Sequence, residues 1–160
     1  MHIGHTVGDD WTIETGLRRM MALETGEETD VAEHPNLLLM RRALDAFRSG
    51  DVPTLAQVFA RDVVWRVPGR SALAKDYKGQ DEVFGFFGRL MELTNGTFRV
   101  ESLDMFANDR GGVFVDRLSA ARDGKTLDVR LLLHVSIRNG QIAEGVDCFH
   151  PEHTWDEFWS

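Results

Sequence analysis

Residues 112–149 read GVFVDRLSAARDGKTLDVRLLLHVSIRNGQIAEGVDCF. Apolar and polar side chains alternate over most of this stretch, which is the pattern of β-strands with one buried face. Asp123-Gly124 and Asn139-Gly140 interrupt the alternation, and both dipeptides are favoured in the two-residue turns of β-hairpins. The stretch therefore predicts an antiparallel meander of three strands, at residues 112–122, 126–138 and 141–149.

Upstream of this meander, apolar residues recur at helical spacing over residues 37–47 and 81–93, and Pro53 begins a shorter helix between them. Residues 62–67 and 97–107 read as strands. Three helices that cover one face of a strongly curved antiparallel sheet define an α+β fold.

The chain divides into three segments. Residues 1–33 form an acidic N-terminal extension with eight acidic residues and two arginines, whose apolar residues favour a short docked helix or else belong to a mobile tail. Residues 34–150 hold the helices and strands. Residues 151–160 form an aromatic C-terminal tail, which we expect to fold back over a pocket mouth or a neighbouring subunit, because aromatic side chains are rarely left in water.

The composition excludes several classes of function. The net charge of -8 argues against nucleic-acid binding, which needs clustered lysine and arginine. No apolar run is long enough to cross a membrane and the first residues lack a signal-peptide pattern, so we expect no membrane contact and a cytoplasmic location. Cys148 is the single cysteine, which leaves no internal disulfide and no thiolate metal site, and we expect no metal or other cofactor.

Counting outward from the turns assigns side chains to the faces of the sheet, because opposite residues of antiparallel strands share a face. The Asn139-Gly140 turn sets Leu132 opposite Asp147 and makes His134 a diagonal neighbour of Asp147. An imidazole held by a carboxylate titrates near neutrality, so this half-apolar face predicts acid/base chemistry on a small molecule. The same pair also fits a structural hydrogen bond or a surface ion pair.

The two faces differ in polarity. Arg117 and Arg130 lie opposite each other on the polar face, and these like charges favour the open, solvated end of the sheet. The other face is apolar apart from Asp116 and Glu144. Because large exposed apolar patches are rare on monomers, we expect helices to cover one face and a second copy of the chain to cover the other, in a homodimer through the sheet.

Aromatic residues suggest how a small hydrophobic ligand would be held. Trp65, Phe84, Phe87 and Phe149 would line a pocket and stack on a flat ligand, or would serve as core residues. Tyr77 would place its hydroxyl at the pocket mouth, or would pack within its turn.

Four short motifs follow one another along the chain: Ser49-Gly50-Asp51, the strand 62–65 before Pro68-Gly69, Tyr77-Lys78-Gly79, and the final hairpin 138–144. In this order they resemble the nuclear-transport-factor-2-like superfamily, specifically its bacterial SnoaL-like branch, over about residues 35–150. The resemblance implies a cone-shaped curved antiparallel sheet wrapped around three N-terminal helices and enclosing an apolar pocket, usually in a dimer. Members include polyketide cyclases, ketosteroid isomerases, dehydratases, epoxide hydrolases and non-catalytic modules, so the fold does not fix the function.

The functional residues of these families transfer only in part. The tyrosine and the general base of ketosteroid isomerases fall at Ala43 and Val67, so that mechanism is not expected. The same comparison places His134, Asp147 and Phe149 on the pocket side, so the resemblance implies that the polar face of the sheet is the interior. SnoaL-type cyclases use a carboxylate near the end of the sheet and a histidine on the neighbouring strand. The resemblance places these roles at Asp147 with His134, or with His150 if the alignment shifts by one residue.

The resemblance and the acid/base pair together imply a cofactor-free cyclase, isomerase or hydrolase that acts on a hydrophobic polyketide-like or cyclic substrate. Asp147 and His134 would be catalytic. The substrate would contact Trp65, Val67, Tyr77, Phe84, Phe87, Arg117, Leu132 and Phe149. The alternative is a non-catalytic ligand-binding or dimerisation module of the same fold, in which the pair is structural.

Overall fold

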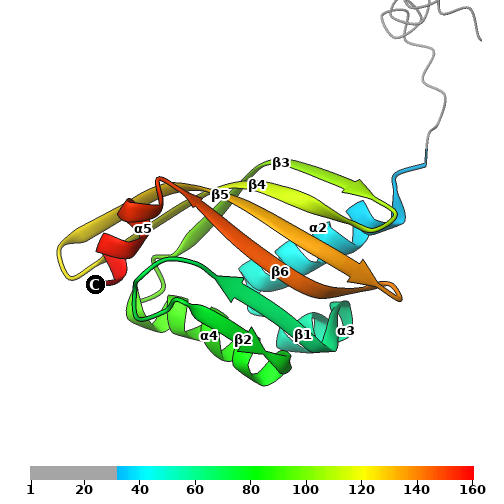
Figure 1. The fold of residues 1–160 in the computed structure, drawn as a ribbon, viewed down its shortest axis with the longest axis horizontal. Coiled ribbons are helices and arrows are strands. Elements are labelled where there is room, and N and C mark those ends of the chain that lie inside the picture. The colour runs from blue at the N-terminus through cyan, green and yellow to red at the C-terminus, as the bar shows by residue number, and fades with distance from the viewer. Residues whose placement is uncertain (1–31) are drawn as a thin grey trace, which may run out of the picture. The chain divides into compact units, whose positions relative to one another are not determined.

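The computed structural model describes residues 32–160, so the predicted acidic extension lies outside the described residues except for its last two. This part of the chain forms four helices and a six-stranded sheet, whose arrangement is drawn in Figure 1. Their order is α2 (Pro35–Ser49), α3 (Val52–Val58), β1 (Phe59–Val67), β2 (Lys75–Lys78), α4 (Gly79–Leu93), β3 (Arg99–Asn108), β4 (Gly111–Arg122), β5 (Lys125–Arg138), β6 (Gln141–His150) and α5 (Glu152–Trp159). The predicted α+β class is confirmed.

The strand order across the sheet is β2-β1-β6-β5-β4-β3 (Figure 1). Only β1 and β6 pair in parallel, and the other neighbours are antiparallel. The meander β4-β5-β6 turns at the two predicted dipeptides, where Asp123, Gly124, Asn139 and Gly140 all have positive φ, as tight hairpin turns require. The sequence therefore predicted the centre of the sheet correctly.

Helix α2 begins and ends at sequence signals. Pro35 occupies its first turn, and the ring nitrogen Nδ1 of His34 accepts the backbone N–H of Asn36 at 3.1 Å. Gly50 ends the helix in the left-handed conformation, with φ of 67°, and its N–H bonds back to the last turn. The buried Met40 on this helix is part of the core between helices and sheet.

The apolar face of the sheet, not the polar one, forms the core. Leu127, Val129, Leu131, Leu133 and Val135 along β5 are all buried, while the residues between them are exposed. Helix α2 packs against β3 and β4, and α4 packs against β1 and β2. The expectation that the polar face is the interior is therefore wrong, because the alternation that buries β5 against the helices turns the polar side chains outward.

A β-bulge in β6 changes the register of the last hairpin. Ile137 pairs with Ile142, but Ser136 pairs with Glu144, so Ala143 is an extra residue in β6. Beyond the bulge, Asp147 therefore pairs with Leu133, and not with Leu132 as counting from the turn predicts.

This one-residue shift moves every later side chain of β6 to the opposite face. Asp147 and Phe149 turn toward the helices, while His134 pairs with Val146 on the outer face. The prediction that His134 and Asp147 share a face is wrong for this reason.

The structure contains two elements that the sequence did not predict. Residues 75–78, which the sequence suggests belong to a loop, form the edge strand β2. Within the aromatic C-terminal tail, residues 152–159 form helix α5. Helix α5 packs on β5 and β6, and the ring of Trp155 stacks on that of Phe149 with centroids 3.7 Å apart. The carboxylate of Asp156 accepts the backbone N–H groups of Arg70 and Ser71, which ties this helix to the loop after β1.

Candidate functional site

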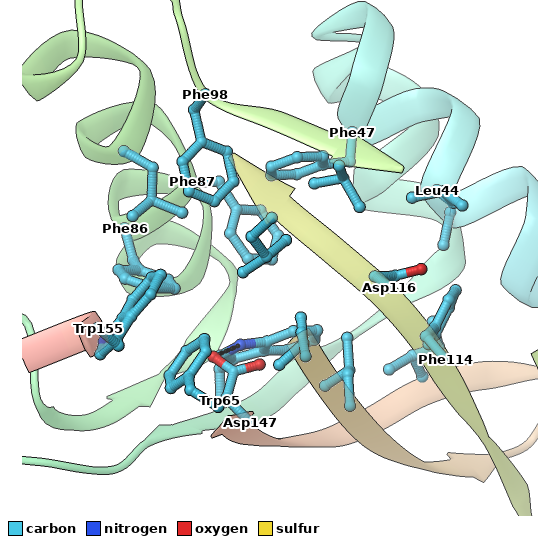
Figure 2. A pocket seen from close by; sticks show the side chains of 18 of the residues that line it. Leu44, Phe47, Trp65, Phe86, Phe87, Phe98, Phe114, Asp116, Asp147 and Trp155 are labelled. Carbon is cyan, nitrogen blue, oxygen red and sulfur yellow. Dashed lines mark hydrogen bonds between the residues drawn. The ribbon is translucent and has the colours of Figure 1, made fainter. Parts of the chain in front are cut away.

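A cavity lies between the inner face of the sheet and the helices (Figure 2). Its volume is about 80 Å³. The lining includes nine aromatic residues: Phe47, Phe59, Trp65, Phe86, Phe87, Phe98, Phe114, Phe149 and Trp155. Aliphatic side chains supply most of the rest, and among residues 32–160 the only titratable ones that line it are Asp116 and Asp147.

Asp147 is held at the cavity wall by a neighbouring strand. It is 6% exposed, and its Oδ2 accepts a hydrogen bond from Nε1 of Trp65 at 3.1 Å. Burial raises the pKa of Asp147 to about 7, and the hydrogen bond from Trp65 acts in the opposite direction. The carboxyl is therefore close to half ionised at neutral pH, which suits a group that gives or takes a proton.

Gly145 makes room for the indole that binds Asp147. Trp65 pairs with Gly145 across β1 and β6, and a Cβ atom on Gly145 would lie 2.4 Å from a ring carbon of Trp65. Since real contacts of that kind are far longer, only glycine permits the ring to lie against the backbone of β6 at this point.

Asp116 is a second buried acid, on β4. It is 2% exposed, and its Oδ1 has no hydrogen-bond partner among the described residues. Burial raises the pKa of Asp116 to about 6, while a hydrogen bond from Ser102 and the positive charge of Arg48 act in the opposite direction. Ser102 is its cross-strand partner on β3.

The two acids lie on different strands of the same face. Asp116 pairs with Leu131 and Asp147 with Leu133, so they are two strands apart and two residues apart along β5. With strands about 4.8 Å apart and a rise of about 3.3 Å per residue, their Cα atoms are separated by roughly 12 Å. Figure 2 shows both side chains among the aromatic rings of the lining. The two carboxyls can therefore contact different atoms of one small molecule.

Of the residues proposed from the sequence, four line this cavity: Asp147, Trp65, Phe87 and Phe149. The structure brings Asp147 and Trp65 into direct contact, and Trp65 packs against Phe87 with their rings perpendicular and centroids 5.2 Å apart.

Three further residues lie in the core but do not line the cavity. Val67 is buried on β1. Tyr77 stacks on Phe86 and donates its hydroxyl to the carbonyl oxygen of Leu73 at 2.7 Å. Phe84 packs edge-on against Phe59, which does line the cavity.

The remaining proposed residues lie on the outer face. His134 is exposed, Leu132 is 45% exposed, and Arg117 forms an ion pair with Asp128, with Nη2 and Oδ2 2.7 Å apart. His150 is also exposed on that face, opposite Arg130. These residues point outward because the polar face of the sheet, which the sequence suggests as the interior, is the exposed face.

Sequence reasoning did not select Asp116, although a signal was present. It is one of two acidic residues in the otherwise apolar face of the meander. Once that face is known to be the interior, an isolated acid on it becomes a candidate functional residue, because carboxyls are rarely buried without a partner.

Other kinds of site have less support. Within residues 32–160, no three side chains of histidine, cysteine, aspartate or glutamate are grouped so that they could hold a metal ion. The helices in that range are all too short or too polar to span a bilayer.

Comparisons with known proteins give a consistent result. The model of a family described as SnoaL-like domain matches residues 40–145. The uncharacterized protein Rv0034 of Mycobacterium tuberculosis is 35% identical over 131 residues, which cover 81% of this chain and all of that protein. Bal32a, from a soil-derived mobile gene cassette, has a solved structure that is 37% identical with a TM-score of 0.77, over 79% of this chain and 97% of that one.

A more distant solved structure has a related description. The putative SnoaL-like polyketide cyclase from Jannaschia sp. CCS1 has a TM-score of 0.67 and 15% identity, over 84% of this chain and 99% of that chain. At this identity the likeness shows the fold alone.

Proposed function

The chain belongs to the SnoaL-like domain family of the nuclear-transport-factor-2-like superfamily, and on this premise we propose that it is a cofactor-free enzyme that moves protons on a hydrophobic cyclic or polyketide-like substrate. The reaction would be a cyclisation, an isomerisation or a hydrolysis. One observation carries the proposal: two buried carboxyls, with pKa values raised to different extents, line a single apolar cavity.

The environments of the two acids favour different roles. The positive charge of Arg48 near Asp116 favours the ionised form of that carboxyl, so Asp116 suits the general base. Burial favours the protonated form of Asp147, and no cation of the described residues acts on it, so Asp147 suits the general acid.

A proton-transfer step follows from these roles. Asp116 removes a proton from the γ-carbon of a conjugated ketone, which lies several ångströms from the carbonyl oxygen, and the electron pair of that C–H bond moves through the conjugated system to form the dienolate. Asp147 gives its proton to the enolate oxygen, and Trp65 stabilises the carboxylate that remains through its N–H. Transfer of the proton on Asp116 to another carbon of the enol, with return of the enol O–H proton to Asp147, completes an isomerisation. In a cyclisation the enol carbon attacks a second carbonyl carbon, the enol O–H proton returns to Asp147, and the new alkoxide takes the proton from Asp116.

The separation of the acids limits the substrate. Since their Cα atoms are roughly 12 Å apart, one rigid molecule can reach both carboxyls only if its reacting atoms lie several ångströms from each other. A flat conjugated or polycyclic ketone has this shape, and its faces would be covered by the aromatic lining.

The second candidate function is a non-catalytic module that binds a hydrophobic ligand. The almost wholly apolar lining favours it, because such a surface gives affinity without chemistry. In that case both carboxyls would only adjust the affinity.

The two functions are separated by asparagine variants. Ligands are first found by thermal shift and native mass spectrometry against polycyclic ketones and epoxides. Turnover of each hit is then measured for wild type, Asp116→Asn, Asp147→Asn and, as a surface control, Asp128→Asn. Catalysis predicts a loss of at least about 100-fold in the first two variants and none in the control. Bound ligands that are never converted would support the binding module instead.

A further inference from the structure

The cavity contains acidic groups and no basic ones. Asp116 and Asp147 are its only titratable lining residues, and no lysine, arginine or histidine of the described chain lines it. All other lining side chains are aromatic or aliphatic. A positive charge on a ligand would therefore meet attraction from the charged residues that line this cavity.

Asp147 is the acid without a counter-charge. Arg48 lies close enough to Asp116 to favour its ionised form, whereas the pKa of Asp147 is affected only by burial and by the neutral indole of Trp65. A buried carboxylate that no cation accompanies is costly, and the cost is recovered when an opposite charge binds beside it.

One aromatic ring contacts this carboxyl, and two further rings pack against that ring. Trp65, which donates to Asp147, also packs against Phe59 and Phe87, with ring centroids 5.8 Å and 5.2 Å from its own. The faces of such rings attract ammonium groups, and more strongly where water is excluded. The same rings would cover the hydrocarbon part of a ligand.

We propose that the cavity binds hydrophobic primary amines, with the ammonium group paired with the carboxylate of Asp147 and the hydrocarbon part among the aromatic rings. This is a property of binding, and it does not depend on whether the cavity also catalyses a reaction. A bound amine would occupy the same space as a neutral substrate and would compete with it.

The experiment compares three probes of equal ring size by isothermal titration calorimetry. They are 2-naphthylmethylamine, the neutral 2-naphthylmethanol and the anionic 2-naphthoate. At pH 8 Asp147 is mostly ionised, because its pKa is about 7, and an alkylammonium still holds its proton. We expect the amine to bind at least tenfold more tightly than the alcohol, and the naphthoate to bind most weakly.

The pH dependence tests the pairing in the unaltered protein. Asp116 is the only other titratable group of the described residues that lines the cavity, and at pH 5 both Asp147 and Asp116 are mostly protonated. The preference for the amine over the alcohol should then fall to less than threefold. This comparison remains decisive even if a variant of Asp147 does not fold.

The variants locate the charge. Asp147→Asn should abolish the preference at pH 8, while Asp128→Asn, which removes an equal charge from the outer face, should retain it. Equal affinities of amine and alcohol in wild type at pH 8 would overturn the proposal. So would a preference that survives Asp147→Asn, or one that only Asp116→Asn removes. None of these three binding results would affect the turnover measured with the asparagine variants.

Discussion

Nε1 of Trp65 donates a hydrogen bond to Oδ2 of Asp147 across the one parallel strand pair of the described sheet, at 3.1 Å. The two residues are 82 positions apart in the chain. Their contact depends on the bulge at Ala143, which turns Asp147 inward, and on Gly145, which leaves space for the indole.

Burial of Asp147 makes stability depend on pH. Its folded-state pKa is raised, so its contribution to stability is fully present below about pH 4 and is lost as the pH rises through about 7. A shift of about three pKa units corresponds to about 4 kcal/mol as an upper bound. We expect Asp147→Asn to be more stable than wild type by about 2–4 kcal/mol at pH 8 and about equal to it at pH 4, measured by urea unfolding.

Asp128→Asn is the control for this prediction. Asp128 is exposed and paired with Arg117, which lowers the pKa of that carboxyl, so its removal should not stabilise the protein at pH 8. Equal effects of the two substitutions at pH 8 would contradict the account of Asp147.

Gly145 should tolerate no side chain. The Cβ of Gly145→Ala would meet the ring of Trp65, so we expect a loss of about 1–3 kcal/mol in the free energy of unfolding and a shift in indole fluorescence. Gly88→Ala is the matched control, because open space surrounds that position on α4, and it should be neutral or slightly stabilising. A harmless Gly145→Ala would mean that the indole does not lie against β6.

His134 should not influence ligands of the cavity. It lies on the outer face and pairs with Val146, so His134→Ala should change ligand affinity and turnover by less than about twofold. Trp65→Phe, which removes the donor to Asp147, should change both and should raise the pKa of Asp147. A large effect of His134→Ala on ligand affinity or turnover would contradict this assignment and would support a functional pair of His134 with Asp147.

A homodimer through the sheet remains a prediction. In such a dimer the outer face of the sheet, away from the helices, would contact the second copy. Phe106 and Leu132 are 57% and 45% exposed there, beside the partly buried Val113 and Val115. We expect light scattering to give the mass of a dimer, and Phe106→Arg with Leu132→Arg to give a monomer. Leu38→Arg, an equally exposed position on α2, should leave the dimer intact, and a monomeric wild type would contradict the prediction.

Local sequence signals predicted most of the fold but only half of the site. The turns at Asp123-Gly124 and Asn139-Gly140, and the end of α2 at Gly50, depend on backbone conformations that few residues adopt, so they could be read directly. The bulge at Ala143 could not be read from the sequence. Residues of β6 do not alternate cleanly between apolar and polar, so one extra residue in that strand leaves no visible break in the pattern.

The extra residue Ala143 determines which acidic residues share a face of the sheet. Counting without the bulge assigned Asp147 to the face of His134, and the true register assigns it to the face of Asp116. The choice of interior face is also a tertiary property, because it depends on which side the helices pack against.

The central claim is that Asp116 and Asp147 are two buried acids prepared for proton transfer. Carboxyl carbon NMR of the protein labelled at aspartate, titrated from pH 3 to pH 9, tests it most directly. We expect one resonance with a midpoint near pH 6 that is absent from Asp116→Asn, and one near pH 7 that is absent from Asp147→Asn. Midpoints of about 4 for both, the ordinary value for aspartate, would contradict the claim.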